Sequence, residues 1–378
     1  MEKEINILIP DGEIELSLRV LNCLSKFKHI KVHVLSRVKW VEIKFSKNIS
    51  SFNYFSEDIS DKEWIEIIKS EIIKRKIDVL MPIYTKNIRL ISKYQKEFNS
   101  LVSNLILPST ESFDVANNKW KLYKLLKEYD INSPDTIYYD PVKKGNTKKL
   151  EFPVLIKPFE GFAGRYILKI NDEKQLLTTL KNRGHTLIQK YIEGYDIDMS
   201  VLCRNGKILA FTIQKGYVFR KSPYSPSLGI EFLYDEKIYK IVEKLITKLN
   251  WSGVAHIDLK YDKVTKDFKV IEINPRFWGS IIGSNKVGVN FAYLYCLTSL
   301  GVDYDIPEYH FENYATNRGL IKILKSKIRG KYSLPKNTSI VDDFFDPLPK
   351  VYKYTIKILK KILPQKTKFI EKFKYEIY

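Results

Sequence analysis

One apolar segment carries polar side chains at every second position. In Lys269–Ser280, KVIEINPRFWGS, two isoleucines alternate with Glu272 and Asn274, and Arg276 follows. Because side chains point to opposite faces in turn along a β-strand, Glu272, Asn274 and Arg276 share one face and the isoleucines occupy the other. A strand face that is merely solvated would also fit this pattern. The segment therefore constrains the fold only through what else in the chain meets that polar face.

A second apolar segment supplies a partner for this face. The stretch WSGVAHIDLKYD places Asp258 in a strand, and DKVTKD links it to the strand that carries Glu272 and Asn274. Such a hairpin lets the three side chains face one another. Carboxylate and amide oxygens suit Mg²⁺ held jointly with substrate phosphates, and unpaired carboxylates in an apolar strand pair would be costly. We therefore predict a metal site here, with Arg276 beside it to stabilise negative charge on a phosphoryl group.

Two upstream segments suit a nucleotide. Lys157 ends the apolar strand FPVLIKP, and the loop FEGFAGRY follows with small residues that bring backbone N–H groups toward phosphate oxygens. Farther on, LIQKYIEGYDIDMSVL turns at Gly194, where backbone groups suit a purine edge and Asp196 suits ribose hydroxyls. Ordinary hairpins are the alternative interpretation of each segment by itself.

In this order, the elements resemble the ATP-grasp family of carboxylate-amine ligases over about residues 109–300. The resemblance rests on Lys119, Lys157 with its loop, the QKYIEG hinge, Asp258 and VIEINPR. NPRFWGS is similar to the branch related to the large subunit of carbamoyl-phosphate synthetase and to D-aspartate ligase-like proteins. This sequence departs from the family pattern in two places. Gln189 stands where the family often has Glu, and the phosphate loop contains Phe162 and Arg165 and has fewer Gly and Ser residues than is usual in the family.

The resemblance implies a role for each matching residue. ATP phosphates would be held by Lys119, Lys157 and a loop of Glu160, Gly161, Phe162, Ala163 and Gly164. Adenine would meet Gln189 and Ile192 through backbone groups, with Lys190 and Tyr191 in the same hinge, and Asp196 would bind ribose. Glu272 would bridge two Mg²⁺ ions, with Mn²⁺ as the alternative metal, and Asp258 and Asn274 would complete one site each. Arg276 and Lys157 would be the catalytic groups.

The implied reaction joins a small-molecule carboxylate to an amine. The carboxylate attacks the γ-phosphate of ATP, and the amine captures the acyl phosphate, so that ADP and phosphate are released. For the second substrate, the candidates are Lys215, Arg220, Trp278 and Ser280, with a solvated loop and core packing as alternatives. Two other functions stay open: an ATP-grasp enzyme that forms a carbamoyl or carboxy-phosphate, and a non-catalytic module that binds a nucleotide or nucleic acid.

The segment pattern predicts the fold class and the domains. Short β runs at Ile5–Pro10, Ile30–Ser36 and Ile77–Ile83 alternate with helical patterns, which indicates parallel βαβ units. We expect an α/β Rossmann-like (pre-ATP-grasp) domain over 1–108 and an α+β ATP-grasp domain over 109–310, with lobes at 109–188 and 189–310. A basic extension over 311–378 would follow. One helix is expected over 113–129, and Asn205-Gly206 predicts a hairpin turn.

The composition narrows the cellular context. A net charge of +20 raises nucleic acid as a partner, but the lysines are dispersed along the chain and are not interleaved with aromatics on one surface, so we do not expect nucleic-acid binding. No signal sequence and no long apolar run appear, so we expect a cytoplasmic protein. The three cysteines form no CxxC pair and are expected to be reduced and buried. A homodimer is one assembly that we leave open.

The end of the sequence predicts a basic amphipathic helix. Residues 350–378 contain nine lysines and two glutamates. The lysines Lys353, Lys357, Lys360 and Lys361 recur at helical spacing opposite Ile356, Leu359, Ile362 and Leu363. Such a helix either contacts an anionic membrane from one side or docks on the protein by its apolar side.

Overall fold

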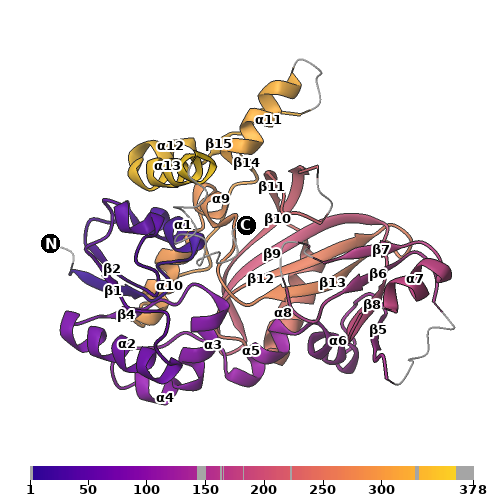
Figure 1. Ribbon diagram of the computed structural model, residues 1–378, viewed down its shortest axis with the longest axis horizontal. Coiled ribbons are helices and arrows are strands. Elements are labelled where there is room, and N and C mark those ends of the chain that lie inside the picture. Colours follow the sequence, from indigo (N-terminus) through magenta and orange to yellow (C-terminus); the bar gives the residue numbers. More distant parts are fainter. Residues whose placement is uncertain are drawn as a thin grey trace.

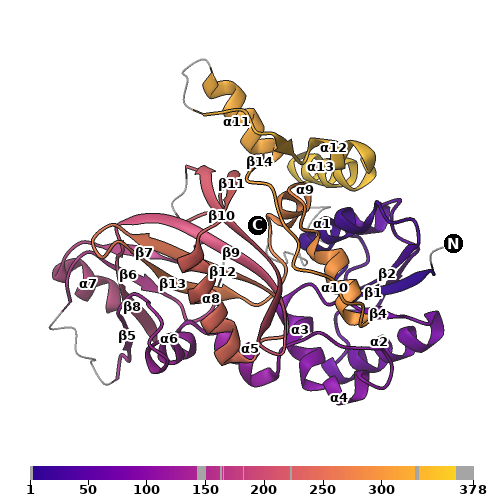
Figure 2. The same ribbon diagram turned by 180° about the vertical axis from the view of Figure 1, so that it is seen from behind.

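The computed structural model describes residues 3–142, 150–161, 164, 166–181, 183–221, 224–327 and 332–362. Within them lie three sheets, and both views show the N-terminal sheet on one side of the molecule and the two others stacked on the opposite side (Figures 1 and 2). In the described part, no helix has the length and apolar character to cross a bilayer.

The N-terminal sheet is parallel throughout, with strand order β3-β2-β1-β4. Its strands are β1 (Ile5–Ile9), β2 (Ile30–Ser36), β3 (Ser51–Tyr54) and β4 (Val79–Leu80). The connecting helices are α1 (Glu15–Leu24), η1 (Glu42–Phe45), α2 (Asp61–Arg75), α3 (Thr85–Lys93) and α4 (Gln95–Phe98). Helix α2 begins in a capping box of Ser60 and Glu63. The expected α/β domain is confirmed.

The predicted helix over 113–129 is two helices, α5 (Thr110–Asn117) and α6 (Lys119–Glu128). At Asn118 the backbone is extended, and its side-chain oxygen accepts hydrogen bonds from the backbone N–H groups of Trp120 and Lys121. Asparagine is a strong N-cap because its side chain satisfies donors that a helix start leaves free. This break places Lys119 at the first position of α6.

The next sheet is antiparallel and has the order β5-β8-β6-β7. It contains β5 (Thr136–Tyr139), β6 (Val154–Lys157), β7 (Leu168–Ile170) and β8 (Thr186–Lys190), with α7 (Glu173–Leu180) between the last two. Its buried residues form a separate small core. The sheet runs to Lys190, two residues past the lobe boundary predicted at 188, and the domain boundaries themselves stay predictions.

The largest sheet has seven strands in the order β13-β12-β9-β10-β11-β14-β15. Its first five strands in chain order are β9 (Gly194–Arg204), β10 (Lys207–Val218), β11 (Gly229–Leu233), β12 (Gly253–Asp262) and β13 (Asp267–Asn274), and α8 (Glu236–Leu249) precedes β12. The predicted hairpin of β9 and β10 turns at Asn205 and Gly206, which have φ of 50° and 75°. The predicted α+β fold with antiparallel sheets is confirmed.

The remaining elements connect the sheets. They are α9 (Ile281–Lys286), α10 (Phe291–Ser299), β14 (Asn313–Ala315), α11 (Asn317–Lys327), β15 (Asn337–Thr338), α12 (Ile340–Phe345) and α13 (Leu348–Ile362). The expected separate extension after residue 310 differs from this, because β14 and β15 continue the large sheet. Helices α9 and α10 pack on α1, so the chain returns to its N-terminal domain after β13 (Figure 1).

Candidate functional site

The hairpin of β12 and β13 brings the three predicted metal donors together. Asp258 is directly opposite Glu272 in the register, and the Nδ2 atom of Asn274 donates to Oδ2 of Asp258 over 3.3 Å. A β-bulge follows Asp258. The side chains of Glu272 and Asp258 keep 18% and 31% of their exposure, so they face a partly open space.

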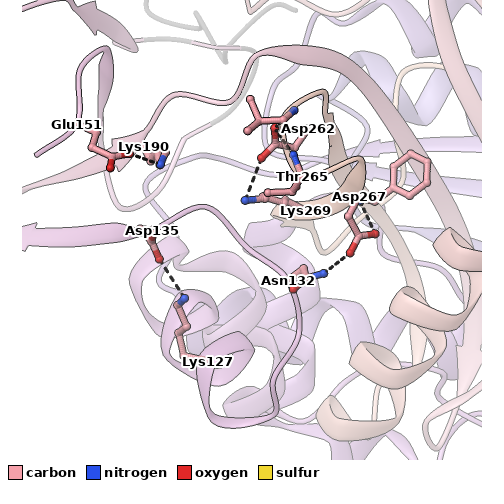
Figure 3. A network of polar contacts seen from close by, with 11 residues as sticks. Lys127, Asn132, Asp135, Glu151, Lys190, Asp262, Thr265, Asp267 and Lys269 are labelled. Carbon is pink, nitrogen blue, oxygen red and sulfur yellow. Dashed lines mark hydrogen bonds and ion pairs between the residues drawn. The ribbon is translucent and has the colours of Figure 1, made fainter.

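The turn of this hairpin is tied to the preceding lobe (Figure 3). Asp262 accepts a hydrogen bond from the backbone of Val264 at 2.8 Å and pairs with Lys269 at 3.1 Å. Across the lobes, Nδ2 of Asn132 donates to Asp267 at 2.6 Å. These contacts fix the hairpin against the segment that follows α6, the helix that carries Lys119.

Two lysines reach the carboxylates from the other lobe. The Nζ atom of Lys119 lies 2.9 Å from Oε2 of Glu272 and donates to the carbonyl of Gly161 at 3.2 Å. Lys157 is buried at the end of β6, and its Nζ donates to Oε1 of Gln189 at 2.7 Å. Burial lowers the pKa of Lys157 to about 8, against the opposing attraction of Glu272. The predicted contact of both cations with ATP phosphates stays a prediction.

Neighbouring groups stabilise the charged form of Glu272 but not that of Asp258. Burial alone would raise the pKa of Glu272, but the charge of Lys119 and hydrogen bonds from Asp258 and Lys119 lower it to about 2. Burial, followed by the charges of Glu272 and Asp198, raises the pKa of Asp258 well above its usual range. A divalent cation would relieve this repulsion and use the same oxygens, so the donor set fits Mg²⁺.

Two residues of this cluster, Asp198 and His256, were not predicted as site residues from the sequence. Asp198 on β9 is opposite Asp258 in the register, and burial with the charge of Asp196 raises its pKa to about 8. The Nε2 atom of His256 lies 3.3 Å from Oδ1 of Asp258 and 3.8 Å from Oδ2 of Asp198. These three residues present ligand atoms within 4.8 Å of one another. The signal for Asp198 was in DIDMS, which alternates like the opening segment.

Arg276 is held in a fixed orientation beside the carboxylates. Its side chain is buried, donates from NH1 to the carbonyl of Phe277 at 2.8 Å, and donates from NH2 to Oδ1 of Asn274 at 3.1 Å. The guanidinium lies 5.5 Å from the ring centre of Tyr84, which follows β4. The carboxyl end of the parallel sheet therefore forms one wall of the site.

The predicted nucleotide contacts are placed as follows. Asp196 forms an ion pair with Lys260 at 2.8 Å, and Lys190 is exposed and paired with Glu151. Gln189 lies in β8, which pairs with a strand on each edge, so its backbone belongs to the sheet. Its side chain contacts the site by accepting a hydrogen bond from Lys157.

The hinge that follows β8 and the phosphate loop complete this side of the site. Tyr191 donates its backbone N–H to Pro153, and Ile192 is buried. Gly161 and Gly164 both have positive φ, Glu160 is exposed, and a Cβ on Gly164 would come within 2.3 Å of the carbonyl of Tyr224. Phe162, Ala163 and Arg165 lie outside the described residues.

The candidates for the second substrate occupy different environments. Lys215 lies over the ring of Tyr195 at 4.2 Å and 3.9 Å from Glu231. Trp278 is buried and stacks on His256 with ring centres 5.7 Å apart, so it supports the histidine from the core. Ser280 exchanges hydrogen bonds with Gln214. Arg220 donates to the carbonyl of Pro226 at 3.1 Å.

Comparison with known proteins shows which domain and which enzymes this chain is similar to. The model of the ATP-grasp domain matches residues 116–280. The chain is 27% identical over 232 residues to D-aspartate ligase of Enterococcus faecium and 27% identical over 209 residues to the large chain of carbamoyl phosphate synthase of Thermoanaerobacter. The chain therefore contains an ATP-grasp domain and is related to these two enzymes, as the sequence elements predicted.

These matches cover the two proteins unequally. They span 54% of this chain and 54% of the D-aspartate ligase, but 51% of this chain and 19% of the synthase chain. Among solved structures, N5-carboxyaminoimidazole synthetase of Staphylococcus aureus in complex with ADP has a TM-score of 0.67 at 16% identity and covers 87% of both chains. The L-amino acid ligase of Bacillus licheniformis has a TM-score of 0.60 at 17% identity, with 82% of this chain and 76% of that chain covered. These two likenesses concern the fold.

Proposed function

We propose that the protein is an ATP- and Mg²⁺-dependent ligase that joins a small-molecule carboxylate to an amine. One observation carries this proposal: Lys119, proposed to bind phosphate, pairs at 2.9 Å with Glu272 of the other lobe, proposed to bind the metal. The domain match and the relation to a D-aspartate ligase agree with it. Mn²⁺ is the alternative metal for the same oxygens.

In the proposed reaction, a carboxylate oxygen attacks the γ-phosphorus of ATP and the bond to the β–γ bridging oxygen breaks. The amine nitrogen then attacks the acyl carbon, and phosphate leaves. Lys119 and Lys157 would bind phosphate oxygens, and the fixed guanidinium of Arg276 would stabilise the acyl phosphate. Bound Mg²⁺ ions would neutralise charge between the two anions. Burial followed by the charge of Arg276 lowers the pKa of His256 to about 3, so this residue stays neutral at physiological pH.

For the substrates, we propose that one of them carries an additional anionic group, which an arginine cluster binds. Arg19 of α1 donates to the carbonyl of Gly279, next to Ser280. Helix α11 contacts the residue before Arg220, because Lys322 donates to the carbonyl of Phe219. Arg318 lies on the same helix.

The electrostatics agree with this cluster. Burial, then the charges of Arg318 and Arg19, lower the pKa of Arg220. Arg19 is already paired with Glu15 at 3.0 Å, so Arg220 and Arg318 are the two cations that favour a carboxylate or phosphate. Lys215 and Ser280 remain candidates for the same substrate, and Trp278 for a supporting role.

The test is ADP release in the presence of Mg²⁺ and a panel of amino acids and sugar acids, with AMP measured in parallel. ADP release that requires both an acid and an amine supports the ligase. Glu272→Gln should lower turnover by roughly 10²–10³-fold, the range for losing one preorganised electrostatic group, whereas Glu173→Gln on the exposed start of α7 should not. ADP release with bicarbonate alone would support the carboxy-phosphate alternative instead, and absence of turnover with bound ATP would support a non-catalytic module.

The arginine cluster has its own readout. Arg318→Ala should raise the KM for the acidic substrate about tenfold, or more, with kcat little changed, because a lost charged hydrogen bond costs about 1.5–3 kcal/mol. Lys325→Ala on the exposed side of α11 is the matched control. An unchanged KM in Arg318→Ala and Arg220→Ala would reject the cluster while the ligase assignment stands.

A further inference from the structure

Helices α12 and α13 expose large apolar side chains in an unusual concentration. Phe344, Phe345 and Ile362 are 81%, 65% and 66% exposed, although they are among the most apolar residues of this region. The complete set within residues 340–362 is Ile340, Val341, Phe344, Phe345, Leu348, Val351, Tyr354, Ile358, Leu359 and Ile362. Single exposed apolar residues are normal, but a contiguous group indicates a contact surface. We call these ten residues the C-terminal apolar surface.

Four of the six members of this surface on α13 form one stripe. Leu348, Val351, Ile358 and Ile362 are spaced so that, at about 100° per residue, they fall within about 80° of one another around the helix. Both views place α12 and α13 side by side at the periphery, above the N-terminal sheet (Figures 1 and 2). The exposed phenylalanines of α12, Phe344 and Phe345, precede Leu348, the first residue of the stripe, by four and three residues.

The opposite side of α13 is already fastened to the protein. Pro349 is buried, and the ring of Tyr352 stacks on Phe45 with centres 4.5 Å apart. The Nζ atom of Lys353 lies 2.9 Å from Glu15 and 3.3 Å from Glu42. The helix is thus docked through a mixed face that contains a lysine. Of the residues predicted on its apolar side, Leu359 and Ile362 are exposed, whereas Leu363 lies outside the described residues.

The charges beside the stripe indicate which kind of partner the stripe binds. Lys357 and Lys361 are exposed on α13, three residues after Tyr354 and Ile358, which belong to the C-terminal apolar surface. A second copy of this chain on the same surface would bring these lysines close to their own counterparts, because a two-fold interface pairs like with like. An anionic lipid surface accepts both features at once: apolar side chains enter the interface and lysines meet the headgroups.

We propose that the C-terminal apolar surface, with Lys357 and Lys361, binds the protein peripherally to an anionic membrane. Docking through Lys353 and Tyr352 holds the surface on the folded domain, so the helix does not have to leave the protein in order to bind. The overall charge of +20 adds long-range attraction to anionic lipid. This inference does not depend on the ligase assignment, because none of its residues belongs to the site between the lobes.

The test is co-sedimentation of the full chain with vesicles of phosphatidylcholine alone and of phosphatidylcholine with phosphatidylglycerol. Binding should require the anionic lipid and weaken as salt is raised. The triple variant F344S/F345S/I358S should lose at least tenfold in partitioning. A matched control is I73S/V264S/V302S, which replaces three exposed apolar residues elsewhere and should bind like the wild type.

The charges are tested separately. Lys357→Glu with Lys361→Glu should weaken anionic vesicle binding about tenfold or more, since each lysine near such a surface contributes about 1 kcal/mol and reversal doubles the change. The circular dichroism spectrum should match that of the wild type for every variant. The proposal is overturned if the wild type ignores anionic vesicles, if F344S/F345S/I358S binds them equally, or if sedimentation finds a dimer that this triple variant dissociates without any vesicle binding.

Discussion

Asp11 in the N-terminal domain and Asp258 in the large sheet are both carboxylates whose pKa is raised by burial. Asp11 accepts hydrogen bonds from the backbone of Ile83 at 2.7 Å and from Nδ2 of Asn87 at 2.9 Å. Burial and then the charge of Glu13 raise its pKa to about 7 against these bonds. Around Asp258, the nearest groups include Glu272 and Asp198, which are themselves acids.

This difference distinguishes a carboxylate with a structural role, Asp11, from one that could bind a cation, Asp258. Asp11 has donors from two neighbouring segments and ties β1 to the residues after β4. Asp258 has one amide donor at 3.3 Å and the neutral His256, which is less than a carboxylate in such surroundings needs. A cation from outside would complete Asp258, whereas it would find the oxygens of Asp11 already occupied.

The largest expected effect is on turnover. Asp258→Asn should lower Mg²⁺-dependent ADP release by roughly 10²–10³-fold, because an amide cannot supply the charge that holds the metal. Asp11→Asn should leave kcat unchanged per folded molecule. Steady-state ADP assays on both variants test the contrast, and equal losses would show that Asp11 belongs to the same machinery.

The next effect is on ligand-induced stability. MgATP at about 100 times its Kd should stabilise the wild type by about 2.7 kcal/mol. Thermal unfolding with ATP in Mg²⁺ and in EDTA should differ for the wild type and for Asp11→Asn. In Glu272→Gln the difference between Mg²⁺ and EDTA should shrink; if it persists at full size, Glu272 is not a metal ligand.

A third effect concerns the stability of the free protein. Asp11→Asn should lower the free energy of unfolding by about 1–3 kcal/mol, because its NH₂ group would face the N–H of Ile83 or the amide of Asn87. Glu173→Gln should change it little. Urea unfolding at pH 7 measures both, and an equally stable Asp11→Asn would mean that the donors find other partners.

The smallest effect is a pH dependence. The folded pKa of Asp11, about 7, lies above its ordinary value of 3.8, so the folded state holds a proton that the unfolded state releases. The free energy of unfolding should therefore fall as pH rises from about 4 to 7, by about 1 kcal/mol between pH 6 and 7, and level off above. Asp11→Asn should flatten this slope in urea titrations across pH 5–8. If the same slope remains in Asp11→Asn, another titrating group causes the pH dependence.

Local patterns in the sequence predicted much of the fold. The buried strands of the parallel sheet, the turn at Asn205-Gly206 and the hairpin that carries Asp258, Glu272 and Asn274 all depend on residues close together in the chain. Alternation along two neighbouring strands is enough to place those three donors on one face. The break at Asn118 was also local, since the capping residue is visible, but the apolar pattern runs through it and favoured a single helix.

The sequence by itself determined the hairpin that brings Asp258, Glu272 and Asn274 together, because alternation along two neighbouring strands is a local feature. Only the tertiary structure decided that Asp198 joins Asp258, that Tyr84 lies under Arg276, and that Lys353 docks α13 with its apolar stripe outward. Each of these contacts joins residues that are far apart in the chain. Local periodicity carries no information about such pairs, since they arise from how whole elements pack.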